Sequence, residues 1–237
     1  MNKMVISDLL QRSPIRAFEQ AINGGLRNGE FGVIAAPSGI GKTSVLVQIA
    51  LDKLLQGKKV IHISFNQHTD YVLVWYKDIF NEFIKKRNLE SEKEVKSEIE
   101  KSRVLMKFNQ EGLTVDQILK SIRALIKDGG FNADSVIIDG LNFSAVKESH
   151  IAAFKAFAVE MGVSIWSSCT VKGAEPLYDK RNIPLVLKDY AELFEVVIVL
   201  EPKQDNITLT VSRDRDANVS DNLALKLDPK TLLILEN

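Results

Sequence analysis

The residues best suited to chemistry lie at positions 36–44, after an apolar run at 31–35 and before an apolar run with helical spacing at 45–55. They are Ala36, Pro37, Ser38, Gly39, Ile40, Gly41, Lys42, Thr43 and Ser44. A glycine-rich turn between a strand and a helix points successive backbone N–H groups at one spot, which makes an anion site. In such a turn Lys42 would reach the β- and γ-phosphates, and the Thr43 hydroxyl would ligate Mg²⁺. The spacing therefore predicts a Walker A phosphate-binding loop, or P-loop, with ATP and Mg²⁺ as its ligands.

One position departs from the usual motif, because Ala36 stands where the loop normally begins with glycine. An alanine is tolerated there if its φ is negative. The alternative interpretation is an ordinary glycine-rich turn between a strand and a helix, and it leaves the Lys42-Thr43 pair unexplained.

A second chemical signal is the apolar run 135–138, which ends in the carboxylate of Asp139. In phosphate-loop proteins an aspartate at this place lies beside the loop and holds the Mg²⁺ shell. Any buried strand can end in aspartate, so the interpretation depends on the loop that accompanies it. We expect Thr43 and Asp139 to form the metal site.

These residues need a scaffold, and the alternation of strand and helix patterns predicts a mostly parallel sheet with helices on both faces. We expect strands near 31–36, 59–65, 103–108, 135–139, 163–169 and 194–200. We expect helices near 14–22, 44–56, 70–87, 91–101, 114–128, 147–161 and 185–192. Beyond residue 200, alternating runs at 206–213, 223–227 and 232–235 predict antiparallel strands at one edge of the sheet. The predicted class is thus a three-layer α/β/α fold.

The composition is that of an ordinary globular protein, and 237 residues suit a single domain spanning 1–237. Lysine plus arginine equals aspartate plus glutamate, 31 against 31, which argues against a strongly electrostatic nucleic-acid binder. Neither a membrane span nor a signal peptide is recognisable, so we expect a cytoplasmic protein with no membrane partner. The strongly charged residues 88–102 predict a solvated surface insertion.

The loop, the strand ending at Asp139 and the lead-in Asn23-Gly24-Gly25-Leu26-Arg27-Asn28-Gly29-Glu30 together resemble the RecA-like ATPases. The patterns most similar to them belong to the KaiC-type proteins and to the motor domain of the DnaB replicative helicase, whose loop Pro37 also resembles. The resemblance extends over residues 14–228. It implies a RecA-like P-loop fold and a homo-oligomer, a ring or filament, with the ATP site at the subunit interface.

The same resemblance gives roles to residues late in the chain. Arg213 and Arg215 match a Lys-x-Arg pair that reaches the γ-phosphate of the neighbouring subunit, and a guanidinium suits that charge. By local composition alone, both are solvated charges on a surface hairpin. Thr170, or Ser168 if the register slips, matches a γ-phosphate sensor. The loop 172–184, which faces nucleic acid in relatives, mixes charges of both signs and gives weak support for DNA binding.

The expected catalytic carboxylate is missing. RecA-like ATPases carry a glutamate after the second strand, where this chain has Asn66. An amide can position water but cannot accept its proton, and loss of a general base costs about two to four powers of ten in rate. The nearby groups that could replace it are Asp70 and His68. We therefore expect slow ATP hydrolysis.

Three classes of function follow from these residues. The leading hypothesis is a Mg-ATP-binding protein whose nucleotide state controls oligomer assembly or partner binding. The alternative is a DNA-dependent ATPase, related to helicases or recombinases, that acts on nucleic acid as a ring or filament. A degenerate scaffold that keeps the loop for structure alone would need neither Lys42, Thr43 nor Asp139.

Overall fold

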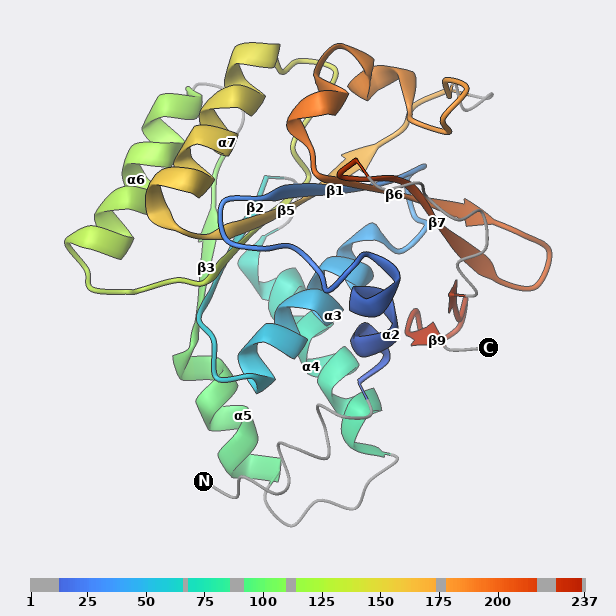
Figure 1. The fold of residues 1–237 in the computed structure, drawn as a ribbon. Helices are drawn as coiled ribbons and strands as arrows, with labels where there is room; N and C mark the ends of the chain where they lie inside the picture. The colour runs from blue at the N-terminus through green and yellow to red at the C-terminus, as the bar shows by residue number, and fades with distance from the viewer. Residues whose placement is uncertain are drawn as a thin grey trace.

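The centre of the fold is β1 (Phe31–Ala36), a strand with all six residues buried because both faces of the sheet are covered. The computed structural model describes residues 13–65, 68–85, 92–109, 114–173, 178–216 and 225–235. These residues form a nine-stranded sheet in the order β3-β2-β4-β5-β1-β6-β7-β8-β9 (Figure 1).

The sheet has a parallel part and an antiparallel part. The parallel strands are β1, β2 (Val60–Ser64), β3 (Arg103–Lys107), β4 (Ser135–Asp139), β5 (Ser164–Thr170) and β6 (Val196–Pro202). The antiparallel strands are β7 (Ile207–Asp214), β8 (Lys226–Leu227) and β9 (Ile234–Leu235). The predicted antiparallel extension at one edge is therefore confirmed.

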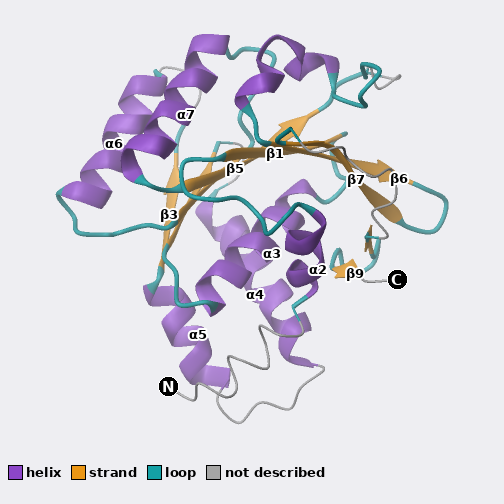
Figure 2. Ribbon diagram, in the orientation of Figure 1, coloured by secondary structure: helices purple, strands orange, loops and turns teal. Residues whose placement is uncertain are grey.

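Helices cover both faces of the sheet, which confirms the predicted three-layer α/β/α fold (Figure 2). One layer contains α2 (Pro14–Ala21), α3 (Lys42–Leu55), α4 (Thr69–Lys85) and α5 (Glu92–Lys101). The other contains α6 (Val115–Lys127), α7 (Glu148–Met161) and the 3₁₀ segment η1 (Leu185–Leu193). The last of these was expected as an ordinary helix, but Tyr190 interrupts it with non-helical angles, φ −138° and ψ 17°.

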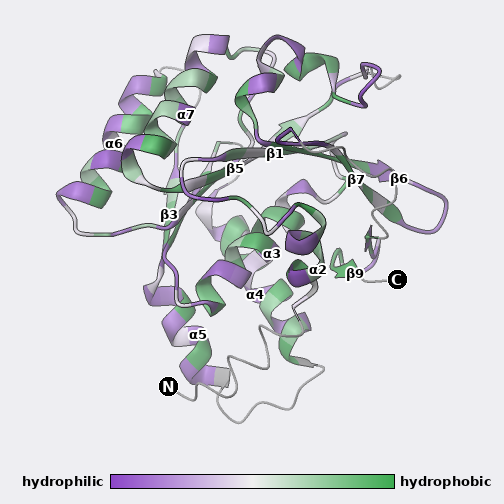
Figure 3. Ribbon diagram, in the orientation of Figure 1, coloured by the Kyte–Doolittle hydropathy of each residue, from purple (hydrophilic) through white to green (hydrophobic). Residues whose placement is uncertain are grey.

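Helix α3 lies in the middle of its layer and is buried on nearly every side. It is mostly hydrophobic along its length, whereas α6 carries hydrophilic residues on one side and buries the other (Figure 3). Two polar side chains of α3, Gln48 and Asp52, are nonetheless completely buried. Each is held by hydrogen bonds from a distant segment: Asp52 by Arg16 of α2, and Gln48 by the C-terminal strands.

The charged segment expected as a surface insertion contains α5. Its two apolar side chains, Val95 and Ile99, are 4% and 5% exposed and belong to the core beneath α3 and α4. Its other described residues are mostly exposed, and Lys101 pairs with Glu98 at 3.3 Å. Positions 88–91 lie outside the described residues.

Candidate functional site

The phosphate loop connects the carboxyl end of β1 to α3, which begins at Lys42. Gly39 and Gly41 have φ of 82° and 96°, angles that favour glycine. A Cβ at Gly39 would meet nothing within 4 Å, so open space lies above the loop backbone. Ala36 is the last residue of β1 and does not have a positive φ, so its side chain causes no strain.

Lys42 is folded back onto its own loop. Its ammonium donates hydrogen bonds to the carbonyls of Ala36 at 3.0 Å and Pro37 at 2.7 Å, and the residue is only 8% exposed. Burial lowers the pKa of Lys42 below its usual value, and the negative charge of Asp139 opposes that shift. A buried cation with two carbonyl acceptors is ready to exchange them for a stronger, anionic acceptor.

Asp139, at the end of β4, is held by two hydroxyl groups. Thr43 Oγ1 donates to Oδ2 at 2.8 Å, and Ser168 Oγ donates to Oδ1 at 2.6 Å. Ser168 Oγ in turn accepts the backbone N–H of Gly140 at 2.8 Å. The two predicted metal-site residues are thus brought together.

The donor set of this pair suits magnesium. A hydroxyl and a carboxylate at hydrogen-bond distance are hard oxygen ligands of the kind that Mg²⁺ takes alongside phosphate and water. Within the described part of the chain, no group of three or more His, Cys, Asp and Glu side chains could hold a metal ion by itself.

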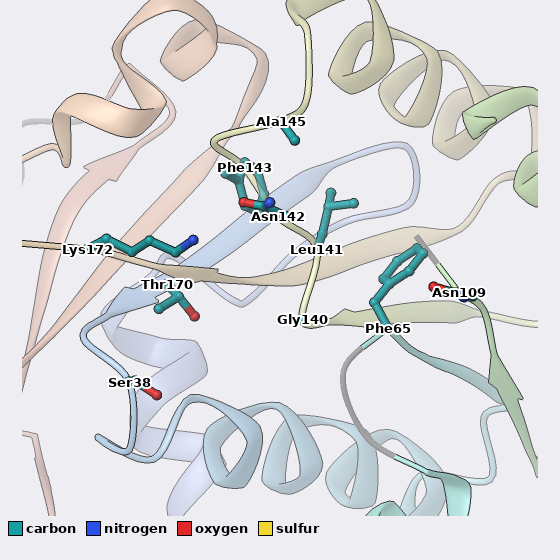
Figure 4. A pocket seen from close by; sticks show the side chains of 10 residues that line it. All are labelled: Ser38, Phe65, Asn109, Gly140, Leu141, Asn142, Phe143, Ala145, Thr170 and Lys172. Carbon is teal, nitrogen blue, oxygen red and sulfur yellow. The ribbon is translucent and has the colours of Figure 1, made fainter. Parts of the chain in front are cut away.

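Two adjoining cavities open at the carboxyl ends of the parallel strands, where ligands bind in α/β sheets. The first, about 230 Å³, is lined by Ser38, Gly39, Gly41, Lys42, Thr43, Ser44, Trp75, Asp139, Gly140, Ser168, Thr170 and Leu232. The second, about 530 Å³, is lined by Ser38, Phe65, Asn109, Gly140, Leu141, Asn142, Phe143, Ala145, Thr170 and Lys172 (Figure 4). Ser38, Gly140 and Thr170 belong to both, so the predicted sensor position lies where the cavities meet.

The predicted water-positioning residue, Asn66, lies outside the described residues. The two groups considered as replacements are close by on the surface: His68 Nδ1 is 3.1 Å from Asp70 Oδ2, with side chains 57% and 80% exposed. Each therefore already has the other as a partner at the start of α4.

Arg213 lies far along the sheet from the loop of its own chain. It is opposite Val197 near the start of β6, and because β1 and β6 run parallel, that is the edge opposite the phosphate loop. Its Nε donates to the carbonyl of Phe194 at 2.7 Å, and Nη1 lies 2.6 Å from the Glu192 carboxylate. Glu192 is itself 66% exposed.

Arg215 is bound entirely within its own chain. Its guanidinium donates to the carboxylates of Glu30 and Asp214 and to the carbonyls of Ile22 and Gly25. Its φ is 53°, a conformation that few non-glycine residues adopt. These bonds fasten the Gly-Gly lead-in to the end of β7.

Sequence patterns do not reveal three contributors to the site. Ser168 was considered only as a sensor, although it lies on β5 next to β4 and on the same face as Asp139, so alternation along the strand could have indicated its role. Trp75 and Leu232 line the first cavity from α4 and from the C-terminal turn. No local signal points to either.

Comparisons with known proteins agree with this geometry. A family model described as an AAA domain matches residues 3–168. Among solved structures, the ATPase domain of a DnaB-like helicase is similar with a TM-score of 0.70 and 15% sequence identity, over 95% of this chain and 90% of that one. No curated protein matches the chain. The structural similarity confirms the predicted RecA-like P-loop ATPase fold. In the described residues, no helix has the length and apolar character needed to cross a membrane.

The contacts of Arg215 predict a pH-dependent loss of stability. Arg215→Ala should lower the free energy of unfolding at pH 7 by about 2 kcal/mol, because it removes charged hydrogen bonds and leaves Glu30 unpaired. Burial alone would raise the pKa of Glu30, but hydrogen bonds from Arg215 and the Arg27 backbone hold it below its ordinary value. The pair therefore stabilises the fold above the unfolded pKa of glutamate, and this contribution disappears as the pH falls through the lowered value.

Urea unfolding of wild type and variant between pH 3 and pH 7 measures this difference. The gap should be widest near neutrality and narrow in acid. Arg181→Ala is the control, because Arg181 is 56% exposed and its pairs with Asp179 and Glu192 are at the surface. An equal loss in both variants, or a gap that does not change with pH, would contradict the assignment.

Proposed function

Because the chain belongs to the AAA domain family, we propose that it binds Mg-ATP at the loop between β1 and α3 and hydrolyses it slowly, so that bound nucleotide acts as a switch. The observation that carries the proposal is the contact between Thr43 and Asp139 beside a buried Lys42. We place the protein in the cytoplasm, where ATP and Mg²⁺ are abundant.

The loop offers ATP three kinds of contact. The backbone turn at Gly39 and Gly41 leaves room for phosphate oxygens, and the start of α3 adds the positive end of a helix. Lys42 would exchange the carbonyls of Ala36 and Pro37 for the β- and γ-phosphates. Thr43 and Asp139 would hold Mg²⁺, which neutralises phosphate charge when bound.

The described lining of the two cavities supports slow hydrolysis. Asp139 is the only carboxylate among those lining residues, and Thr43 and Ser168 occupy its oxygens. A carboxylate bound in this way is poorly placed to accept a proton from water. With Asn66 at the position of the usual glutamate, the chain is left without a strong general base.

We also propose that the nucleotide site is completed by a neighbouring subunit. Arg213 is the better candidate for that contact, because it has one carbonyl and one exposed carboxylate to release. Arg215 would have to give up its bonds to Glu30, Asp214 and two carbonyls, so a role in trans is costlier for it. A site shared between subunits links ATP binding to assembly.

The alternative, a DNA-dependent ATPase, has one supporting observation: exposed Lys172 lines the larger cavity. The other cation of that loop whose contacts are described, Arg181, is paired with Asp179 and Glu192. The local charge is therefore largely neutralised, and we favour the nucleotide switch over a nucleic-acid motor.

The first test is the affinity for ATP. Lys42→Ala should weaken Mg-ATP binding at least about tenfold, because it removes the main cation that faces the phosphates. Isothermal titration measures it, with Lys127→Ala as a control at an exposed ion pair. Unchanged affinity in Lys42→Ala would show that the loop is not the site.

The second test asks whether position 66 limits hydrolysis. Asn66→Glu should raise ATP turnover about tenfold or more, because it restores a group able to take the proton of the attacking water. Gln67→Glu is the matched control, which adds the same charge one residue away. A wild-type rate of several turnovers per second that falls in Asn66→Ala would refute slow hydrolysis.

The third test concerns assembly. Size-exclusion chromatography with light scattering should show a larger species with Mg-ATP than without nucleotide. Arg213→Ala should reduce that shift while leaving the nucleotide-free profile unchanged, because the residue would act across the interface. Profiles that are identical with and without Mg-ATP would count against control of assembly by nucleotide.

A further inference from the structure

The C-terminal hairpin, residues 226–235, lies against the start of α3. It consists of β8, β9 and the turn that joins them, and each strand has two residues. Strand β9 pairs only with β8 among the described strands. A pairing this short is marginal by itself, so the position of the hairpin depends on what it packs against.

Gln48 supplies that support from within α3. Its Nε2 donates to the carbonyl of Leu232 at 2.9 Å, and its Oε1 accepts the backbone N–H of Ile234 at 2.9 Å. The side-chain amide thus bonds the hairpin on both sides of Leu233, as a neighbouring strand would. Gln48 is completely buried, so no water competes for these bonds.

The residue held in this way has an unfavourable backbone conformation. Leu232 has a φ of 55°, which is strained for a residue with a branched side chain. Its carbonyl accepts a second hydrogen bond from Ser44 Oγ at 2.7 Å. Ser44 and Gln48 together therefore keep Leu232 at a place that the hairpin alone would not favour.

That place is one wall of the smaller cavity. Leu232 lines it together with Lys42, Thr43 and Ser44, and a Cβ at Gly41 would come within 2.6 Å of Leu227 Cδ2. Lysine of a phosphate loop reaches the β- and γ-phosphates, whereas the backbone cradles the α- and β-phosphates. Asp139 marks the metal end of this cavity. Leu232, bonded to Ser44, lies beyond the loop in the other direction, where the nucleoside leaves the phosphates.

We infer that the C-terminal hairpin forms the wall of the nucleotide site at its nucleoside end, and that Gln48 is the positioning residue that holds it there. This inference rests on the proposed ATP site and adds a claim about which part of the nucleotide the hairpin contacts. Gln48 itself touches no phosphate. It acts through Leu232, so its loss affects a nucleotide differently from a bare polyphosphate.

The experiment compares two ligands on matched variants. Gln48→Leu should weaken Mg-ATP binding about tenfold, because it leaves the Ile234 N–H without its acceptor and frees the hairpin. The same variant should bind magnesium tripolyphosphate within about twofold of wild type, since that ligand needs only the loop. Hydrogen exchange at residues 225–235 should quicken in the same variant. Gln56→Leu, just past the end of the same helix and bonded to Asp52, is the control and should change neither affinity.

A second variant separates contact from folding. Leu232→Gly keeps the turn, because glycine accepts a positive φ, but removes the side chain from the cavity. It should fold as wild type by circular dichroism, bind tripolyphosphate normally and lose affinity for ATP. If wild type binds neither ligand, the proposed ATP site fails. If wild type binds both and the two variants keep full ATP affinity, or lose both ligands equally, the role of the hairpin is overturned.

Discussion

The site depends on one buried carboxylate that is kept in place by its neighbours. Asp139 is only 6% exposed, and a buried carboxylate without partners would be strongly destabilising. Thr43 and Ser168 each donate a hydrogen bond to one of its oxygens. Thr43 belongs to the phosphate loop, Ser168 to β5 and Asp139 to β4, so this interaction joins three elements that meet only because the sheet places them side by side. The position of the loop is fixed by the same bonds that define the metal site.

Helix α3 extends this constraint into the rest of the molecule. Its first turn faces the phosphate cavity, and its interior carries Gln48 and Asp52 into an otherwise apolar layer. Each buried polar group has its bonds with a different distant segment, and this ties α2 and the C-terminal hairpin to one rigid rod. A displacement of the phosphate loop would therefore be felt at both ends of the chain.

The parts that the sequence predicts are those with a local signal. Strand β4 matches its expected bounds, and the loop could be recognised because Gly39 and Gly41 require positive φ while Lys42 and Thr43 follow at fixed spacing. Element ends differ by one to a few residues, as at α3, which begins at Lys42 instead of near 44 because the phosphate loop runs directly into it. The contact of Leu232 with Ser44 joins residues 188 positions apart in the chain, and no periodicity encodes such a pair. The kink at Tyr190 likewise depends on packing, since its ring stacks on Phe143 and its hydroxyl bonds the Phe143 carbonyl.

The two arginines after β7 show how one motif divides into two physical roles. They are two residues apart, yet Arg215 is surrounded by carbonyls and two carboxylates of its own chain, whereas Arg213 faces Glu192 near the surface. A guanidinium with all its hydrogen-bond partners inside the fold stabilises the lead-in turn, and it can act on a neighbour only at the expense of that turn. One whose main partner is exposed can exchange it for a phosphate with little loss, because the released carboxylate is then solvated. Any dependence of assembly on nucleotide should therefore pass through Arg213, while Arg215 sets the stability of the subunit that presents it.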